Sequence, residues 1–142
     1  MAPSIASNKL ISLAAEGKIC TAFGIKITRG GEIVHIAKAA GYDSLFIDLE
    51  HTCMSVQDAS QMCITAISAG VTPFVRVPHE CGHGFIQRIL DVGAMGVVVP
   101  HIHGVGTYFH HVHTCNTYLS SSAVQQILHT MPPSYFSSWA NQ

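Results

Sequence analysis

Short apolar runs alternate with segments of helical periodicity along the first hundred residues of the chain. Four runs hold β-branched and aromatic residues without a helical period, and each predicts a buried strand. They cover residues 18–27, 44–49, 72–77 and 96–100. Three segments between them predict helices, because apolar residues recur there at intervals of three and four positions. These helices cover residues 32–40, 55–69 and 84–92, so a strand–helix unit recurs about every 25 residues.

Strands that alternate with helices are expected to run parallel, since only a connection of helix length returns the chain to the same edge of a sheet. The sequence therefore predicts the α/β class. Each predicted strand is followed by polar residues, and the carboxyl ends of parallel strands share one face of a barrel or one edge of an open sheet. We expect five side chains to gather there: Asp48, Glu50, His51, Arg76 and His101.

Composition narrows the classes of protein that the chain can represent. Its 142 residues are 48% hydrophobic and 11% charged, which favours one globular domain over a disordered chain. The formal net charge of -1 offers no basic surplus, so nucleic acid and membrane surfaces are not expected partners. No apolar run approaches the roughly 20 residues of a membrane span, and the five cysteines form no C-x-x-C pair. We expect a soluble, cytoplasmic protein with reduced thiols.

The segment LFIDLEH, residues 45–51, carries the first candidate chemistry. An imidazole beside a carboxylate at a strand end can act as a general acid–base catalyst whose tautomer and pKa the carboxylate sets. The alternative for His51 is a solvated strand end with a helix-capping acid. Arg76 follows the next strand, and its guanidinium can hold a carboxylate through two parallel hydrogen bonds. The alternative for Arg76 is a structural ion pair with Asp48 or Glu50.

Asp91 is the third acidic candidate, at the end of the third predicted helix. A carboxylate gains nothing from the helix dipole at that end, so it needs a compensating partner. The partner is either an active-site imidazole or a nearby backbone turn. The residues alone favour the turn.

The chain after residue 105 breaks the strand–helix pattern. It contains one weak helical segment, residues 123–129, and no Asp, Glu, Lys or Arg. Histidines that could in principle bind a transition metal begin just before it, but no carboxylate or rigid element accompanies them, so metal storage there is the weaker alternative. They are His101, His103, His110, His111 and His113. The sequence contains no G-x-G-x-x-G, P-loop or G-x-S-x-G motif. It therefore gives no basis for dinucleotide binding, P-loop nucleotide binding or an α/β-hydrolase.

Three segments together resemble the HpcH/HpaI aldolase family of metal-dependent pyruvate aldolases. They are GYDSLFIDLEH at 41–51, PFVRVP at 73–78 and IQRILDVGAMGVVVPHI at 86–102, within a resemblance that runs from about residue 8 to residue 102. The resemblance implies a TIM barrel, a divalent metal (Mg, Mn or Co) and a 2-oxo acid substrate. It also implies reversible retro-aldol cleavage of a 4-hydroxy-2-oxo acid to pyruvate and an aldehyde.

By the same resemblance His51 would be the catalytic acid–base, and Arg76 would bind the substrate carboxylate and stabilise the enolate. Asp91 and Asp48 would raise the basicity of His51, which reverses the preference for a turn at Asp91. The family holds its metal through a Glu and an Asp in later motifs of the type V-Q-I-E-T and G-P-A-D-L-S. Neither motif occurs in this chain, so we assign no metal ligand.

The resemblance and the length together predict how the chain is organised. Residues 1–105 would form the N-terminal half of an aldolase-type barrel, about four β/α units of a fold that typically needs about 250 residues. Residues 106–142 would form an atypical, poorly ordered tail after a truncation. A carbon–carbon lyase and a non-catalytic partial barrel that pairs with another subunit both remain open. The family's association through barrel faces predicts a homo-oligomer.

Overall fold

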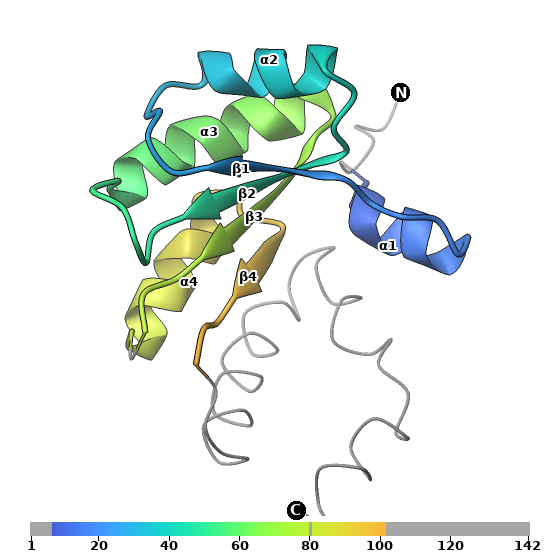
Figure 1. Cartoon of the computed structure of the whole chain (residues 1–142). Helices are drawn as coiled ribbons and strands as arrows, with labels where there is room; N and C mark the ends of the chain where they lie inside the picture. The colour runs from blue at the N-terminus through green and yellow to red at the C-terminus, as the bar shows by residue number, and fades with distance from the viewer. Residues whose placement is uncertain (1–6, 80, 102–142) are drawn as a thin grey trace, which may run out of the picture.

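The computed structural model describes residues 7–79 and 81–101, which form four strands and four helices (Figure 1). The elements follow one another as α1 (Lys9–Ala15), β1 (Ala22–Ile25), α2 (Glu32–Ala39), β2 (Ser44–Asp48), α3 (Val56–Ala69), β3 (Thr72–Arg76), α4 (His83–Asp91) and β4 (Gly96–Val98). The predicted alternation of strands and helices is confirmed. The prediction of a poorly ordered tail at 106–142, and the histidines from His103 onward, lie outside the described residues.

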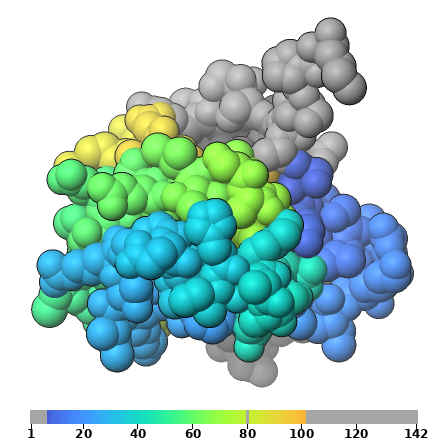
Figure 2. Space-filling view, turned by 90° about the horizontal axis from the view of Figure 1, so that it is seen from above, coloured from blue at the N-terminus to red at the C-terminus, as the bar shows by residue number. Residues whose placement is uncertain are grey.

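All four strands run parallel in one sheet, in the order β1-β2-β3-β4. Each strand therefore lies beside its predecessor in the chain. Right-handed crossovers between such neighbours place every connecting helix on the same face, as in a barrel. In Figure 1, α2 and α3 lie along one face of the sheet, and Figure 2 shows them forming a continuous outer layer from above. The α/β class is confirmed, in the arrangement of a barrel segment.

The core lies between the sheet and these helices. In β2, Leu45 and Ile47 are fully buried on the helix side, and Val75 of β3 continues this apolar layer. Phe46 and Phe74 are register partners on the other face, and both are only half-buried. Successive strand side chains alternate between faces, so Asp48 and Arg76 share the face of the two phenylalanines.

Helix α3 has the ends that its sequence predicts. The side chain of Ser55 accepts the backbone N–H of Asp58, and the Asp58 carboxylate accepts the backbone N–H of Ser55, which forms a capping box. At the other end Gly70 adopts φ 72°, a left-handed conformation that glycine tolerates at a helix terminus. These caps fix where the loop from β2 ends and where β3 begins.

Helix α1 was not predicted. The Asn8 side chain caps it by accepting the backbone N–H groups of Leu10 and Ile11, while its amide donates to the carbonyl of Met95. The backbone N–H of Lys9 donates to the hydroxyl of Thr72 at the start of β3. Helix α1 is therefore tied to the amino edge of the sheet, opposite the carboxyl edge where the predicted site lies.

Strand β1 is shorter than the predicted run of residues 18–27. Ile19 and Ile27 lie outside the strand and are 87% and 91% exposed. The predicted strand was too long because it was drawn from apolar content alone. Only the four residues from Ala22 to Ile25 pair with β2. None of the described helices combines the length and the apolar character that a bilayer span requires.

Candidate active site

The carboxyl edge of the sheet brings together the five side chains that the strand ends predicted. Asp48 is the last residue of β2 and Arg76 the last of β3, and the two are register partners. Glu50 and His51 begin the loop after β2, while His101 follows β4. Contacts join all five into one cluster. The prediction that these residues gather at one edge is confirmed.

An ion pair between Asp48 and Arg76 forms the centre of the cluster. Arg76 donates from Nε to Oδ1 of Asp48 at 2.9 Å and from Nη2 to Oδ2 at 2.6 Å. The Asp48 side chain is fully buried, and the Nζ of Lys26 lies 3.5 Å from its Oδ2. The hydrogen bonds from Arg76 hold the pKa of the Asp48 carboxyl well below its usual range, although burial alone would raise that pKa. Asp48 therefore stays ionised at neutral pH.

Asp48 also shapes the loop that follows β2. Its Oδ1 accepts the backbone N–H of Glu50 at 3.0 Å and that of His51 at 3.3 Å. Its carbonyl accepts the hydroxyl of Thr52 at 2.6 Å. This is the local turn that Asp side chains favour at strand ends. Asp48 thereby positions both residues that carry the candidate chemistry.

Arg76 forms the ion pair with Asp48 and Glu50 that the sequence offered as the alternative to substrate binding. Two of the five guanidinium N–H groups point to Asp48. Nη1 lies 3.1 Å from Oε2 of Glu50, and the side chain is 20% exposed. The guanidinium lies over the Phe46 ring at 5.8 Å from its centroid, which further fixes its plane. Among the described residues Nη1 forms an ion pair with Glu50 but no hydrogen bond, so a further carboxylate could accept N–H groups of Nη1 and Nη2.

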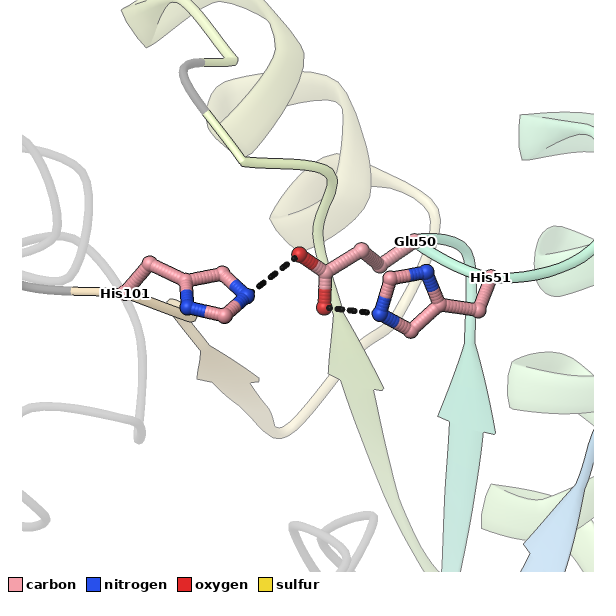
Figure 3. A group of neighbouring side chains, drawn as sticks. All are labelled: Glu50, His51 and His101. Carbon is pink, nitrogen blue, oxygen red and sulfur yellow. Dashed lines mark ion pairs between the residues drawn. The ribbon is translucent and has the colours of Figure 1, made fainter.

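Glu50 is the functional candidate to which the sequence assigned no separate role. Its side chain is only 6% exposed, yet Oε2 accepts no hydrogen bond from any described residue. Oε2 lies 3.5 Å from Nε2 of His51, and Oε1 lies 3.4 Å from Nε2 of His101 (Figure 3). The sequence signal for this role of Glu50 was its position next to His51, just after a predicted strand. The missing information was the proximity of His101, about 50 residues away in the chain.

His51 faces Glu50 rather than the two aspartates named for it. Asp48 contacts only the backbone N–H of His51, while the imidazole is 61% exposed beside Glu50. Asp91 is exposed at the end of α4, the helix that leads from the carboxyl edge after β3 to the amino edge before β4. The described chain therefore does not bring Asp91 to His51. The role of either aspartate in raising the basicity of His51 stays a prediction.

One group of described residues could hold a metal ion. Glu50, His51 and His101 each offer a ligand atom, and these atoms lie within 4.8 Å of one another. One carboxylate and two imidazoles suit a borderline transition ion better than Mg²⁺, which prefers oxygen ligands. A metal at Nε2 of His51 would occupy the lone pair that a general base needs. The group therefore does not fit an aldolase metal that works together with His51 as the base.

The cysteines add no chemistry to this edge. Cys20, Cys53, Cys63 and Cys81 are free thiols in the described part of the chain. Burial raises the pKa of Cys63 to about 12, so this thiol is protonated at neutral pH. Of these four thiols only Cys63 is fully buried, the reduced state stays a prediction, and Cys115 lies outside the described residues.

Two curated proteins similar to this chain carry the same aldolase name. A 4-hydroxy-4-methyl-2-oxoglutarate aldolase of Hapsidospora irregularis is 46% identical over 108 residues, covering 76% of this chain and 40% of that protein. A protein of the same name from Chaetomium globosum is 44% identical over the same share of each chain. The chain thus spans about 40% of the length of these relatives.

A solved structure supports the same assignment. An HpcH/HpaI aldolase/citrate lyase family protein from Burkholderia cenocepacia superposes with a TM-score of 0.63 at 26% identity, over 76% of this chain and 42% of that one. The four-stranded sheet therefore corresponds to part of a barrel of this kind. The family's sequence model matches residues 30–117, more than half of the chain. The chain belongs to the HpcH/HpaI aldolase/citrate lyase family.

Proposed function

We propose that this chain supplies the acid–base and carboxylate-binding part of a pyruvate-aldolase site. The reaction is the reversible cleavage of a 4-hydroxy-2-oxo acid into pyruvate and a carbonyl compound. The observation that carries the proposal is the cluster of Asp48, Arg76, Glu50 and His51 at the carboxyl edge of the sheet. The aldolase names of the two curated relatives support it, with 4-hydroxy-4-methyl-2-oxoglutarate as the first substrate to test.

Arg76 binds the carboxylate of the 2-oxo acid in this proposal. Asp48 takes Nε and one N–H of Nη2, which fixes the guanidinium plane and leaves the outer edge toward the site. Two parallel hydrogen bonds from that edge match the spacing of carboxylate oxygens. The same cation lies close to the negative charge that develops on the enolate as the carbon–carbon bond breaks.

His51 transfers the proton. Its Nε2 accepts the proton of the C4 hydroxyl, the C3–C4 bond breaks, and the electron pair passes into the enolate of pyruvate. The imidazolium then returns the proton to C3, so pyruvate leaves and the base is restored. Glu50, 3.5 Å from Nε2, stabilises the imidazolium formed between the two steps. A divalent ion, for which we assign no ligand in this chain, would supply Lewis-acid polarisation of the 2-oxo group.

The proposal is tested by following pyruvate release from 4-hydroxy-4-methyl-2-oxoglutarate with and without Mg²⁺ or Mn²⁺. His51→Ala should abolish release, while His35→Ala, at an exposed position on α2, should leave it unchanged. Arg76→Lys keeps the charge but loses the planar fork, so it should raise KM. Release that persists in His51→Ala would contradict the assignment of the base.

A second candidate is a non-catalytic barrel segment that pairs with another subunit. Within the described residues β1 and β4 each pair with one strand only, and the half-buried Phe46 and Phe74 face away from the helices. Open strand edges and apolar surface both favour association. A stable oligomer in light scattering, combined with no pyruvate release under any metal condition, would favour this candidate over the lyase.

A further inference from the structure

We propose that Glu50, His51 and His101 form a binding site for a divalent transition-metal ion of the zinc type. The site uses none of the later-strand ligands that the family resemblance implies. It does not rest on the proposed lyase function, because the ion binds without substrate. An ion at Nε2 of His51 would occupy the lone pair that the proposed base needs, so metal binding and proton transfer exclude each other at this residue. Two imidazoles and one carboxylate form a donor set that zinc takes in proteins, with a fourth position left for water.

The first support is the distance between the donor atoms. Zinc binds imidazole nitrogen and carboxylate oxygen at about 2.0–2.2 Å, so two ligands of a tetrahedral ion lie about 3.4 Å apart. Glu50 Oε2 lies 3.5 Å from Nε2 of His51, and Glu50 Oε1 lies 3.4 Å from Nε2 of His101. Charge-assisted hydrogen bonds are shorter, about 2.7–2.9 Å. Each imidazole thus lies at about this spacing from one of the two carboxylate oxygens, and with one ligand atom from each residue all three atoms lie within 4.8 Å of one another.

The second support is the state of the Glu50 carboxylate. The Glu50 side chain is only 6% exposed, and its Oε2 has no hydrogen-bond donor among the described residues. A buried carboxylate oxygen in this state costs free energy unless a cation compensates it. Arg76 Nη1 lies 3.1 Å away and compensates part of the charge, but its guanidinium is already bonded twice to Asp48. A metal ion at Glu50 would supply the missing interaction.

The third support is the position of the two exposed imidazoles around the carboxylate. His51 and His101 are 61% and 54% exposed, and Figure 3 shows them on opposite sides of the Glu50 carboxylate. One ligand atom from each of the three residues lies within 4.8 Å of the other two. Closing a separation of 4.8 Å to the tetrahedral spacing of about 3.4 Å needs a relative shift of about 1.4 Å between two donor atoms.

His101 has a backbone conformation that few residues adopt. Its φ is 54°, and it is the one described non-glycine residue with positive φ. Its ring meets that of His79 edge to face, with centroids 5.2 Å apart. A strained residue at a site edge persists when its position serves the site. With this backbone conformation Nε2 of His101 lies 3.4 Å from Oε1 of Glu50.

The test is a titration of the full-length chain with Co²⁺, whose visible absorption reports four- or five-coordinate nitrogen and oxygen ligands. Because the histidines His103, His110, His111 and His113 could bind the same probe, the titration uses a parent in which all four are alanine. We expect this parent to bind one ion, and Zn²⁺ to displace the cobalt signal. Glu50→Gln and His101→Ala should each weaken binding by about tenfold or more.

His35→Ala is the matched control, because His35 is an exposed imidazole on α2, away from the carboxyl edge. It should bind Co²⁺ as the parent does. His101→Ala changes a surface residue, so it remains informative if Glu50→Gln does not fold, as judged by circular dichroism. A parent that binds no cobalt would overturn the proposal, as would a folded His101→Ala variant that binds as tightly as the parent.

Discussion

Replacing Arg76 with methionine should destabilise the fold mainly through the carboxylate it leaves behind. The change keeps most of the apolar stem over Phe46 but removes the two hydrogen bonds to Asp48. Asp48 is fully buried, and stranding a buried charge typically costs about 3–5 kcal/mol. Two backbone N–H groups and Lys26, 3.5 Å away, still compensate part of the charge. We therefore expect a loss near the lower limit, about 3 kcal/mol at pH 7.

The same ion pair predicts how the stability difference between wild type and Arg76→Met changes with pH. The pKa of Asp48 is lowered in the folded state by Arg76. Its stabilising contribution is therefore complete above the unfolded pKa of about 3.9 and is lost as pH falls toward the folded value. In Arg76→Met the stranded carboxyl accepts a proton more readily. The gap in stability between wild type and variant should therefore narrow below about pH 4.

Urea denaturation of both proteins between pH 7 and pH 3, followed by circular dichroism, measures this gap. Arg88→Met is the matched control, since Arg88 is exposed on α4, and it should cost no more than about 0.5 kcal/mol. Adding Asp48→Asn to Arg76→Met removes the stranded charge and should recover much of the loss. A loss below about 1 kcal/mol at pH 7, or a gap that does not change with pH, would refute the assignment of a buried ion pair.

Three further predictions test other parts of the structure. Ser55→Ala removes the capping box of α3 and should cost about 1 kcal/mol in urea denaturation, whereas a cost near zero would contradict the cap. Cys63 should react with a thiol reagent only after unfolding, while the exposed Cys53 reacts in the native protein, and equal native rates would contradict the burial. Because the Cys63 pKa is raised to about 12, the unfolded thiol ionises first, so stability should fall above about pH 8.5 and Cys63→Ala should reduce that fall.

The strand order and the location of the site could be predicted because they follow from local pattern and topology. Apolar runs with polar ends place Asp48 and Arg76 at one edge once the strands are parallel. Helix α1 could not be predicted in this way, because its stability comes from tertiary bonds such as Asn8 to Met95. It has no buried residue to mark it in the sequence.

The division of roles within the site depended on contacts that spacing does not reveal. The sequence offered Asp48 and Asp91 as partners of the imidazole, whereas the carboxylate beside the His51 ring belongs to Glu50. The Asp48 carboxylate instead accepts hydrogen bonds from Arg76, because their register places the two side chains next to each other. The approach of His101 to Glu50 depends on a positive φ that the sequence does not signal.

The central claim is that His51 exchanges a proton with a 2-oxo acid held by Arg76. The most direct measurement is the loss of the pyruvate methyl signal in D₂O, followed by proton NMR with Mg²⁺ or Mn²⁺ present, because enolisation requires no aldehyde partner. The account predicts exchange with the intact chain and with His35→Ala, and none above background with His51→Ala. Exchange that continues unchanged in His51→Ala, or that is absent from the intact chain, would contradict the claim.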